Sequence, residues 1–184
     1  MKKKRNLKQE LWYLCYMEFM NAILFIFLYF CYTRILEIKF HIVTLYPLLL
    51  ISLILIEGSI YWFICLSRTK KKDKNLYRTS VAPIYNFLNI FNIVLFVIYI
   101  PVFIVNINQT GIIGELIGLS LYLFALIEQI NYFCYRLSYY TKNGLGLKVV
   151  DPAVKFFTGK ASRSLIYKEI HTYKNNTKDM KNNT

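Results

Sequence analysis

The sequence predicts an all-α, polytopic membrane protein with four transmembrane helices, and the evidence is segment length and charge placement. Four apolar stretches of about 22 to 25 residues each occur along the 184-residue chain, and a helix needs about 20 apolar residues to cross a hydrocarbon layer of about 30 Å. All 23 Lys and Arg residues lie outside these stretches. Because lipid offers the backbone no hydrogen bonds, each stretch is expected to be helical.

The expected spans are 11–33, 42–66, 84–105 and 112–135, which together make a transmembrane domain over 11–135. A basic segment, 1–10, precedes this domain and a basic tail, 136–184, follows it. The first span is too long for the core of a signal peptide, and no small-residue cleavage site follows it. We therefore expect a retained membrane anchor.

The basic residues predict the direction of the spans. They gather before the first span, between the second and third, and after the fourth, whereas the other two connections hold only Arg34 and Lys39. The clusters are Lys2, Lys3, Lys4, Arg5 and Lys8; Arg68, Lys70, Lys71, Lys72, Lys74 and Arg78; and the Lys-rich tail. Lys and Arg mark cytoplasmic flanks, so both termini are expected in the cytoplasm and the protein in the cytoplasmic membrane. The abundance of Lys, Asn, Ile and Tyr predicts an AT-rich genome, as in low-GC bacteria.

Several functional classes are disfavoured. The pI of about 9.6 would suit nucleic-acid binding, but no stacking platform or groove-reading motif accompanies the charge, so no nucleic-acid partner is expected. The four cysteines form no CxxC pair, and His41 and His171 lie outside the spans, so we expect no cofactor and leave metal binding open. No nucleophile stands beside a base. We therefore assign no catalytic residue and expect a protein that is not an enzyme.

The two halves of the transmembrane domain partly match at an offset of 71 residues. This offset places the first span on the third and the second on the fourth. The matched pairs include Asn21 with Asn92, Glu57 with Glu128, and Tyr61 with Tyr132. A tandem two-helix repeat would explain the match. Chance similarity between apolar sequences is the alternative, and both remain open.

Polar side chains are expected at one depth in the half of the bundle near the basic flanks. Glu18, Glu57 and Glu128 each lie about 8 to 10 residues from the basic end of a span, or roughly 12–15 Å deep at 1.5 Å per residue. Asn86 and Gln129 lie nearby, and the other half of the bundle is expected to be almost wholly apolar. The predicted polar cavity comprises Glu18, Asn21, Glu57, Tyr61, Asn89, Asn92, Glu128, Asn131, Tyr132 and Arg136.

This polar cluster has two interpretations. A charge in hydrocarbon costs at least about 2.5–3.5 kcal/mol, and Arg136, the cation nearest in sequence, cannot neutralise three carboxylates. The polar side chains could bond across helices for about 0.6–2 kcal/mol each and so hold the bundle together. Alternatively, they could line a cavity open to the cytoplasm that takes a proton, a metal ion or an organic cation.

The tail is expected to be amphipathic and to lie on the anionic inner leaflet. Apolar and basic residues alternate in it as far as Ile170, and 173–184 is polar and expected to be disordered. The residues concerned are Val154, Phe156, Phe157, Leu165, Ile166 and Ile170, mixed with Lys155, Lys160, Arg163 and Lys168. Gly114 and Gly118 form a GxxxG motif, which indicates either close packing within the chain or a dimer contact.

Small size, absent catalytic chemistry and a basic tail favour a non-enzymatic accessory, regulatory or immunity-type factor that works with a membrane protein partner or as a homo-oligomer. The alternative is a small transporter or channel for protons, metal ions or organic cations, which the buried carboxylates favour.

Overall fold

The computed structural model describes residues 7–35, 41–71, 81–107, 109, 111–137, 139–140, 147–148, 158 and 161–182. Five helices lie in these ranges, together with one antiparallel pair of two-residue strands. The helices are α1 (Leu7–Ile35), α2 (Ile42–Lys70), α3 (Ala82–Asn106), α4 (Gly111–Phe133) and α6 (Leu165–Asn182). The strands are β1 (Tyr139–Tyr140) and β2 (Leu147–Lys148).

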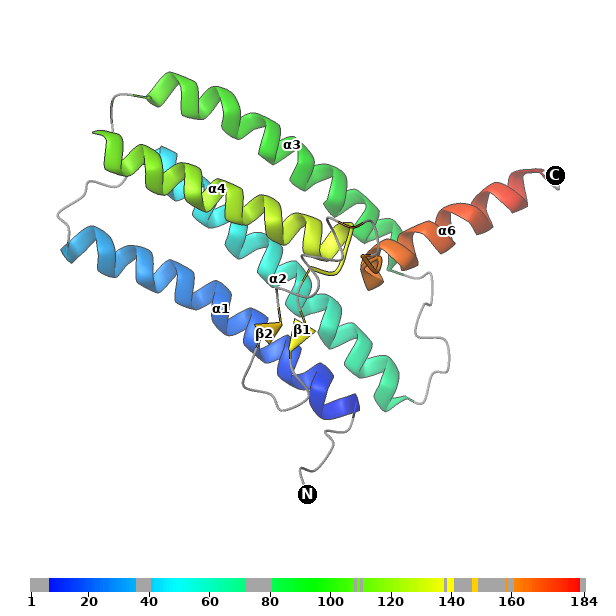
Figure 1. Ribbon diagram of the computed structural model, residues 1–184. Coiled ribbons are helices and arrows are strands. Elements are labelled where there is room, and N and C mark those ends of the chain that lie inside the picture. The colour runs from blue at the N-terminus through cyan, green and yellow to red at the C-terminus, as the bar shows by residue number, and fades with distance from the viewer. Residues whose placement is uncertain are drawn as a thin grey trace.

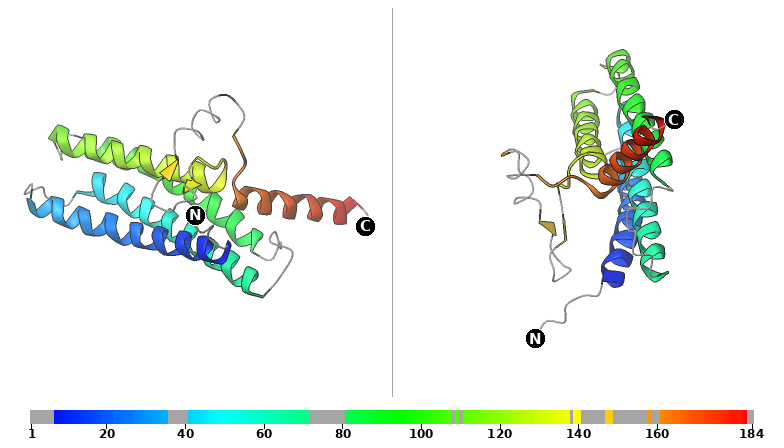
Figure 2. Two further views of the ribbon diagram at one scale, coloured as in Figure 1. Left: turned by 60° about the horizontal axis from the view of Figure 1, so that its bottom comes forward. Right: turned by 90° about the vertical axis from the view of Figure 1, so that its right-hand side faces the viewer.

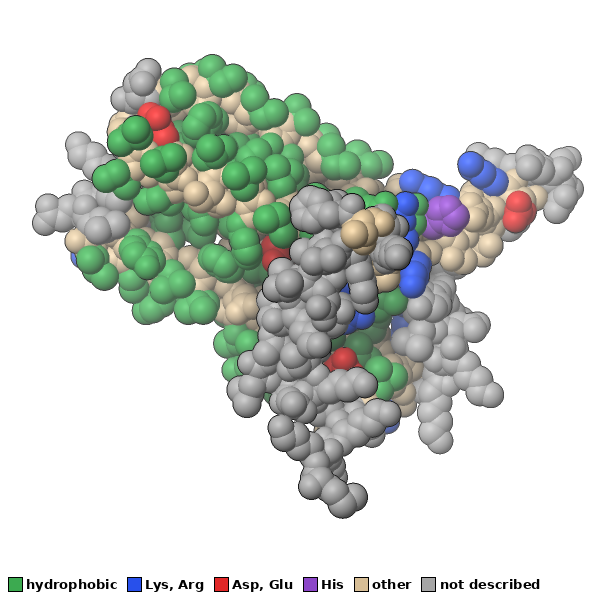
Figure 3. All heavy atoms as spheres, in the orientation of Figure 1, with side chains coloured by type: hydrophobic (Ala, Val, Ile, Leu, Met, Phe, Trp, Pro, Cys, Tyr) green, Lys and Arg blue, Asp and Glu red, His purple; other side chains and the backbone are tan. Residues whose placement is uncertain are grey.

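Helices α1 to α4 are long and apolar enough to cross a membrane. This confirms the expectation of four apolar helices and indicates a multi-pass membrane protein. The helices extend beyond the apolar stretches, since α1 begins at Leu7 and α2 continues to Lys70. Side chains such as Phe27, Phe87 and Ile113 are about 60% exposed, and Figure 3 shows hydrophobic side chains over much of the visible bundle. An apolar surface of this extent suits contact with lipid.

Helix α2 is the centre of the bundle (Figure 1). It packs closely against α1, α3 and α4, and 61% of its apolar part is buried, compared with 17% in each of the other three. Helices α1 and α3 begin, and α2 and α4 end, at the end of the bundle from which α6 leaves (Figures 1 and 2). We call this the tail end, and the opposite end the far end.

Two glycines allow helices to approach α2 closely. A Cβ atom added at Gly118 of α4 would lie 2.7 Å from the Val43 carbonyl oxygen, and one at Gly58 of α2 would lie 2.5 Å from the Tyr132 ring. Gly118 therefore serves a contact within the chain, which is one of the two interpretations of the GxxxG motif.

The first two and the last two membrane helices pack differently as pairs. Helices α1 and α2 pack closely along their length, whereas in the described part of the chain α3 and α4 are not a closely packed pair. Long side chains fill the space between α3 and α4, as where the stacked rings of Tyr99 and Tyr122 meet at a centroid distance of 4.7 Å. The tandem repeat stays a prediction.

The tail differs from the expectation of a disordered C-terminal stretch, because α6 continues to Asn182. The Ser164 hydroxyl oxygen accepts a hydrogen bond from the backbone N–H of Tyr167 at 3.1 Å, which caps the start of the helix. No glycine or proline interrupts the sequence from 165 to 182. In the distal half, the Thr177 hydroxyl bonds the Tyr173 carbonyl at 2.9 Å. Composition alone suggested disorder because this half is polar on every side.

Candidate functional site

A chain of polar side chains joins α2, α3 and α4 inside the tail half of the bundle. The Asn92 Nδ2 group donates to Glu57 Oε2 at 2.8 Å and to Gln129 Oε1 at 3.1 Å. The Gln129 Nε2 group in turn donates to Asn89 Oδ1 at 2.9 Å. Asn92 is fully buried and Glu57 is 4% exposed. These bonds are the cross-helix contacts expected of polar residues that stabilise a membrane bundle.

Two acceptors in this network remain unpaired. Glu57 Oε1 and Asn92 Oδ1 are buried and have no hydrogen-bond partner among the described residues. An unpaired buried acceptor costs about 1–3 kcal/mol. Exchanging the O and N atoms of the Asn92 amide would not remove the problem, because Nδ2 already donates to two acceptors. Protonation of Glu57 would remove the buried charge, and a bound small cation would give such an oxygen a partner.

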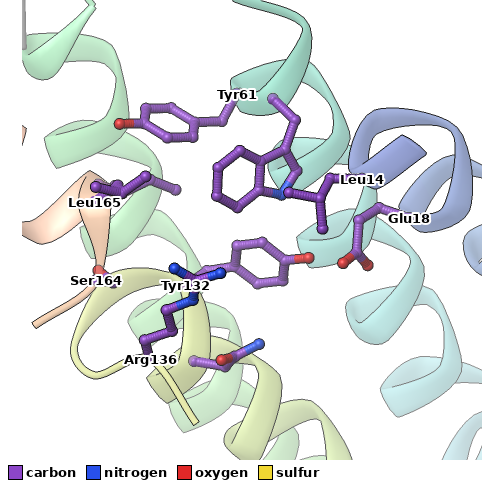
Figure 4. A pocket seen from close by; sticks show the side chains of 10 residues that line it. Leu14, Glu18, Tyr61, Tyr132, Arg136, Ser164 and Leu165 are labelled. Atoms are coloured by element: carbon purple, nitrogen blue, oxygen red, sulfur yellow. The ribbon is translucent and has the colours of Figure 1, made fainter. Parts of the chain in front are cut away.

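A cavity of about 40 Å³ lies beside this network, between α1, α2, α4 and the start of α6. Five residues of the predicted site line it: Glu18, Tyr61, Asn131, Tyr132 and Arg136. Figure 4 shows the Tyr132 hydroxyl directed at the Glu18 carboxylate, with which it forms a hydrogen bond. One water molecule needs about 10–15 Å³, so the cavity has room for a few waters or a small ion but not for a large organic solute.

A second carboxylate lies close to this cavity. Glu128 is near enough to Glu18 for the two to interact electrostatically, and Glu128 Oε2 accepts a hydrogen bond from Asn131 Nδ2 at 3.3 Å. The Asn131 Oδ1 atom accepts from the backbone N–H of Leu137 at 2.9 Å. The end of α4 is thereby connected to the acidic pair.

The structure thus places the predicted residues in two adjoining groups. One holds Glu57, Asn89 and Asn92, and the other surrounds the cavity with Glu128 beside it. Asn21 is half-buried on α1 and is not among the described residues that line the cavity. Tyr61 shares a helix face with Glu57, as expected, but its hydroxyl donates to a residue of the tail.

That tail residue is Glu169, and sequence analysis missed it. Arg68 Nη2 lies 2.9 Å from Glu169 Oε1, and Arg68 Nη1 donates to Glu169 Oε2 at 3.2 Å. The Tyr61 hydroxyl also donates to Glu169 Oε2, at 3.1 Å. Glu169 is 1% exposed and Arg68 is 8% exposed. Arg68, which the sequence placed in a basic loop, therefore takes part in a buried two-point ion pair.

The sequence did contain a signal for this contact. Ile166, Glu169 and Ile170 lie at positions i, i+3 and i+4 and so share one helix face. Ile166 and Ile170 are 2% and 8% exposed and belong to the core of the bundle. The expectation that these two residues lie on the leaflet is wrong, because they pack against the bundle. Val154, Lys155, Phe156, Phe157 and Lys160 lie outside the described residues.

Further contacts connect the base of the tail to the end of α4. The backbone N–H of Arg136 donates to the Ser162 carbonyl at 2.9 Å, and that of Ser164 donates to the Cys134 carbonyl at 3.1 Å. The Arg163 guanidinium stacks over the Tyr135 ring at 4.1 Å and the Tyr167 ring at 4.6 Å, which is cation–π geometry. The start of α6 is therefore joined to the bundle by charge, backbone and aromatic contacts.

The far half of the bundle is less apolar than expected, because buried and half-buried tyrosine hydroxyls connect its helices. The Tyr99 hydroxyl donates to the Val43 carbonyl at 2.8 Å, and the Tyr29 hydroxyl bonds Thr44 Oγ1 at 2.9 Å. Similar bonds run from Tyr46 to the Leu95 carbonyl at 2.9 Å and from Tyr122 to the Phe96 carbonyl at 3.2 Å. Each hydroxyl has a partner, so this half has the character of a structural scaffold.

Comparison of the chain with protein-family models, with curated proteins and with solved structures finds no match. The class of protein is therefore defined by the structure itself. It is a multi-pass membrane protein with four long apolar helices, in which α1, α2, α4 and the start of α6 surround a small cavity lined by Glu18 and Arg136.

Proposed function

We propose that the protein is a non-enzymatic accessory, regulatory or immunity-type factor of the cytoplasmic membrane that presents helix α6 to a partner protein. The observation that supports this proposal is the contrast within α6. Its first turns are fixed to the bundle through Glu169 and Ile170, whereas side chains such as Lys168, Lys174 and Lys178 are exposed.

The anchored base makes an exposed helix feasible. An isolated helix of this length is marginal in water, and the mostly polar distal half of α6 lacks an apolar face to bury. The buried ion pair and the capping residue Ser164 fix the first turns, so that later residues add to an existing helix. The result is an arm that extends beyond the bundle (Figure 2). Such an arm suits docking to a partner in the cytoplasm or at the leaflet surface.

Site-specific photo-crosslinking in the source cells tests this function. A photoreactive side chain at Lys174 is expected to give a discrete adduct with one partner, and Glu169→Ala is expected to abolish it. Glu10→Ala is the matched control, because Glu10 is an exposed glutamate in the first turn of α1. The adduct should persist after Glu57→Gln and Glu128→Gln. An adduct that survives Glu169→Ala would contradict the proposal.

The carboxylates in and beside the cavity favour a second candidate function, a small transporter or channel for protons or metal ions. Glu18 and Glu128 lie close together, and Glu57 keeps an oxygen without a partner among the described residues. Arg68 is bound to Glu169, and the one basic residue among the described residues that line the cavity is Arg136. The cavity volume of about 40 Å³ favours a proton or a small ion over an organic cation.

Flux into liposomes separates the two functions. A transporter should lose proton or metal-ion flux when Glu18, Glu57 and Glu128 are all replaced by Gln, while Glu115→Gln should retain it, because Glu115 lies near the far end of α4. Unchanged flux in the triple variant would exclude the transport function and leave the accessory role in place.

A further inference from the structure

A groove lies on the outward face of α1 and α2 toward the tail end, away from the acidic cavity. It has a volume of about 400 Å³. Trp12, Tyr16 and Phe19 line it from α1, and Ile60, Phe63 and Lys70 line it from α2. These aromatic and aliphatic side chains are largely exposed, with Trp12 at 57% and Phe63 at 59%. In a protein that spans a membrane, this surface faces lipid.

The groove changes in character along its length. The single charged residue among its described lining residues is Lys70, which ends α2. From Phe63 to Lys70 the helix rises about 10 Å at 1.5 Å per residue. The rings of Trp12 and Tyr16 stack at a centroid distance of 5.4 Å. The groove therefore leads from an apolar, aromatic stretch within the bilayer to a cation at its surface.

Polar atoms at the base of the groove are already paired with each other. The Ser59 hydroxyl donates to the Cys15 carbonyl at 2.9 Å and lies 3.6 Å from Cys15 Sγ. The groove therefore presents a mainly apolar surface to an occupant, and Lys70, the one charged residue among its described lining residues, lies at the end where a lipid headgroup would be.

We propose that this groove binds one acyl chain of an anionic phospholipid, whose phosphate contacts Lys70. The inference rests on the membrane-spanning fold and is independent of the proposed function. Charge complementarity identifies the occupant, because an anionic headgroup interacts favourably with Lys near the membrane surface. A zwitterionic lipid of equal chain length would fill the apolar stretch and gain less from Lys70.

Native mass spectrometry of the full chain in detergent provides the test, with phosphatidylglycerol and phosphatidylcholine of identical acyl chains as probes. Phosphatidylglycerol should bind more tightly, and Lys70→Gln should weaken it about fivefold, the factor that corresponds to about 1 kcal/mol per basic residue at an anionic surface. Lys71→Gln is the matched control, because Lys71 is exposed and does not line the groove. An equal loss in both variants would overturn the proposal.

A second pair of variants tests the apolar part of the groove. Ile60→Trp should fill it and weaken both lipids, whereas Leu49→Trp, at a position of similar exposure near the far end of α2, should weaken neither. Circular dichroism confirms that each variant is folded. Undiminished lipid binding in Ile60→Trp would overturn the proposal, as would a dimer that excludes lipid from the wild-type groove.

Discussion

The two halves of this bundle use polar groups in different ways. In the far half, single tyrosine hydroxyls bond carbonyl or hydroxyl oxygens on neighbouring helices, and the hydroxyls of Tyr29 and Tyr99 both have partners. In the tail half, carboxylates and carboxamides bond one another, and Glu57 and Asn92 each retain an oxygen that has no partner among the described residues. Among the described residues, the buried side-chain atom of the far half without a hydrogen-bond partner is His41 Nδ1, at the start of α2. The tail half combines stabilising bonds with unpaired oxygens that are available to a ligand.

The largest effect is expected for the buried ion pair between Arg68 and Glu169, which lies in the tail half. Glu169→Ala leaves Arg68 largely buried without its carboxylate, and loss of one partner of a buried pair costs about 3–5 kcal/mol. The fraction of molecules in which α6 is detached from the bundle should increase more than a hundredfold, since each 1.4 kcal/mol is a factor of ten in an equilibrium constant. Limited proteolysis of the tail measures this change.

Two controls define the prediction for the ion pair. Glu10→Ala removes an exposed glutamate and should change tail proteolysis little. Replacing both partners, Arg68→Met with Glu169→Leu, should restore much of the protection, because no uncompensated charge remains. If Glu169→Ala resembles Glu10→Ala, the tail is not held by this pair.

The next effect compares close helix contacts in the two halves. Gly118→Ala would place a Cβ 2.7 Å from the Val43 carbonyl oxygen, so α4 must move from α2 at a cost of about 1–3 kcal/mol. Gly58→Ala would place a Cβ 2.5 Å from the Tyr132 ring, so the ring must move and its bond to Glu18 must change. Thermal unfolding should detect both variants. Carbodiimide labelling of Glu18 should change only in Gly58→Ala. Equal labelling in the two variants would contradict the assignment of the Tyr132 contact to Gly58.

The sequence was sufficient to predict four apolar helices, because length and hydrophobicity determine which segments can cross a bilayer. It also identified Glu57 and Asn92 as buried, since acids and amides within apolar segments are rare. It did not separate the predicted residues into a network and a cavity. That separation depends on how each helix is rotated about α2, which spacing along one helix does not determine.

The features that sequence analysis missed have specific causes. Glu169 lies in a polar, basic segment, where a glutamate looks solvent-exposed, and only its position between Ile166 and Ile170 indicates burial. Tyr29 and Tyr99 were counted as apolar, so their hydroxyls were not considered as cross-helix donors. In each case the deciding partner lies on another helix, from 15 residues away for Tyr29 and Thr44 to 101 residues away for Glu169 and Arg68.

The polar network of the tail half should depend on Asn92 for stability more than on the charge of Glu57. Asn92→Ala removes two cross-helix bonds, at about 0.6–1.7 kcal/mol each in a membrane protein. Glu57→Gln keeps an acceptor for Asn92 Nδ2 and removes the buried carboxylate, so stability should be unchanged or higher. Denaturant-induced unfolding in detergent micelles measures both. A Glu57→Gln variant less stable than Asn92→Ala would show that the carboxylate itself stabilises the bundle.

The smallest expected effects are in the far half and would complete the comparison. Tyr29→Phe and Tyr99→Phe each remove one hydroxyl, and bonds of this kind contribute about 0.6 kcal/mol on average. Their acceptors, Thr44 and the Val43 carbonyl, are adjacent on α2, so the double variant tests whether α1 and α3 are coupled through this point. Independent contacts would give a double loss equal to the sum of the single losses within about 0.3–0.5 kcal/mol.

Protease resistance of the tail and lipid binding should remain at wild-type levels in these variants, because neither hydroxyl contacts α6 or the groove in the described part of the chain. A change in either property would show that the two halves are coupled, and the far half could then no longer be regarded as a passive scaffold.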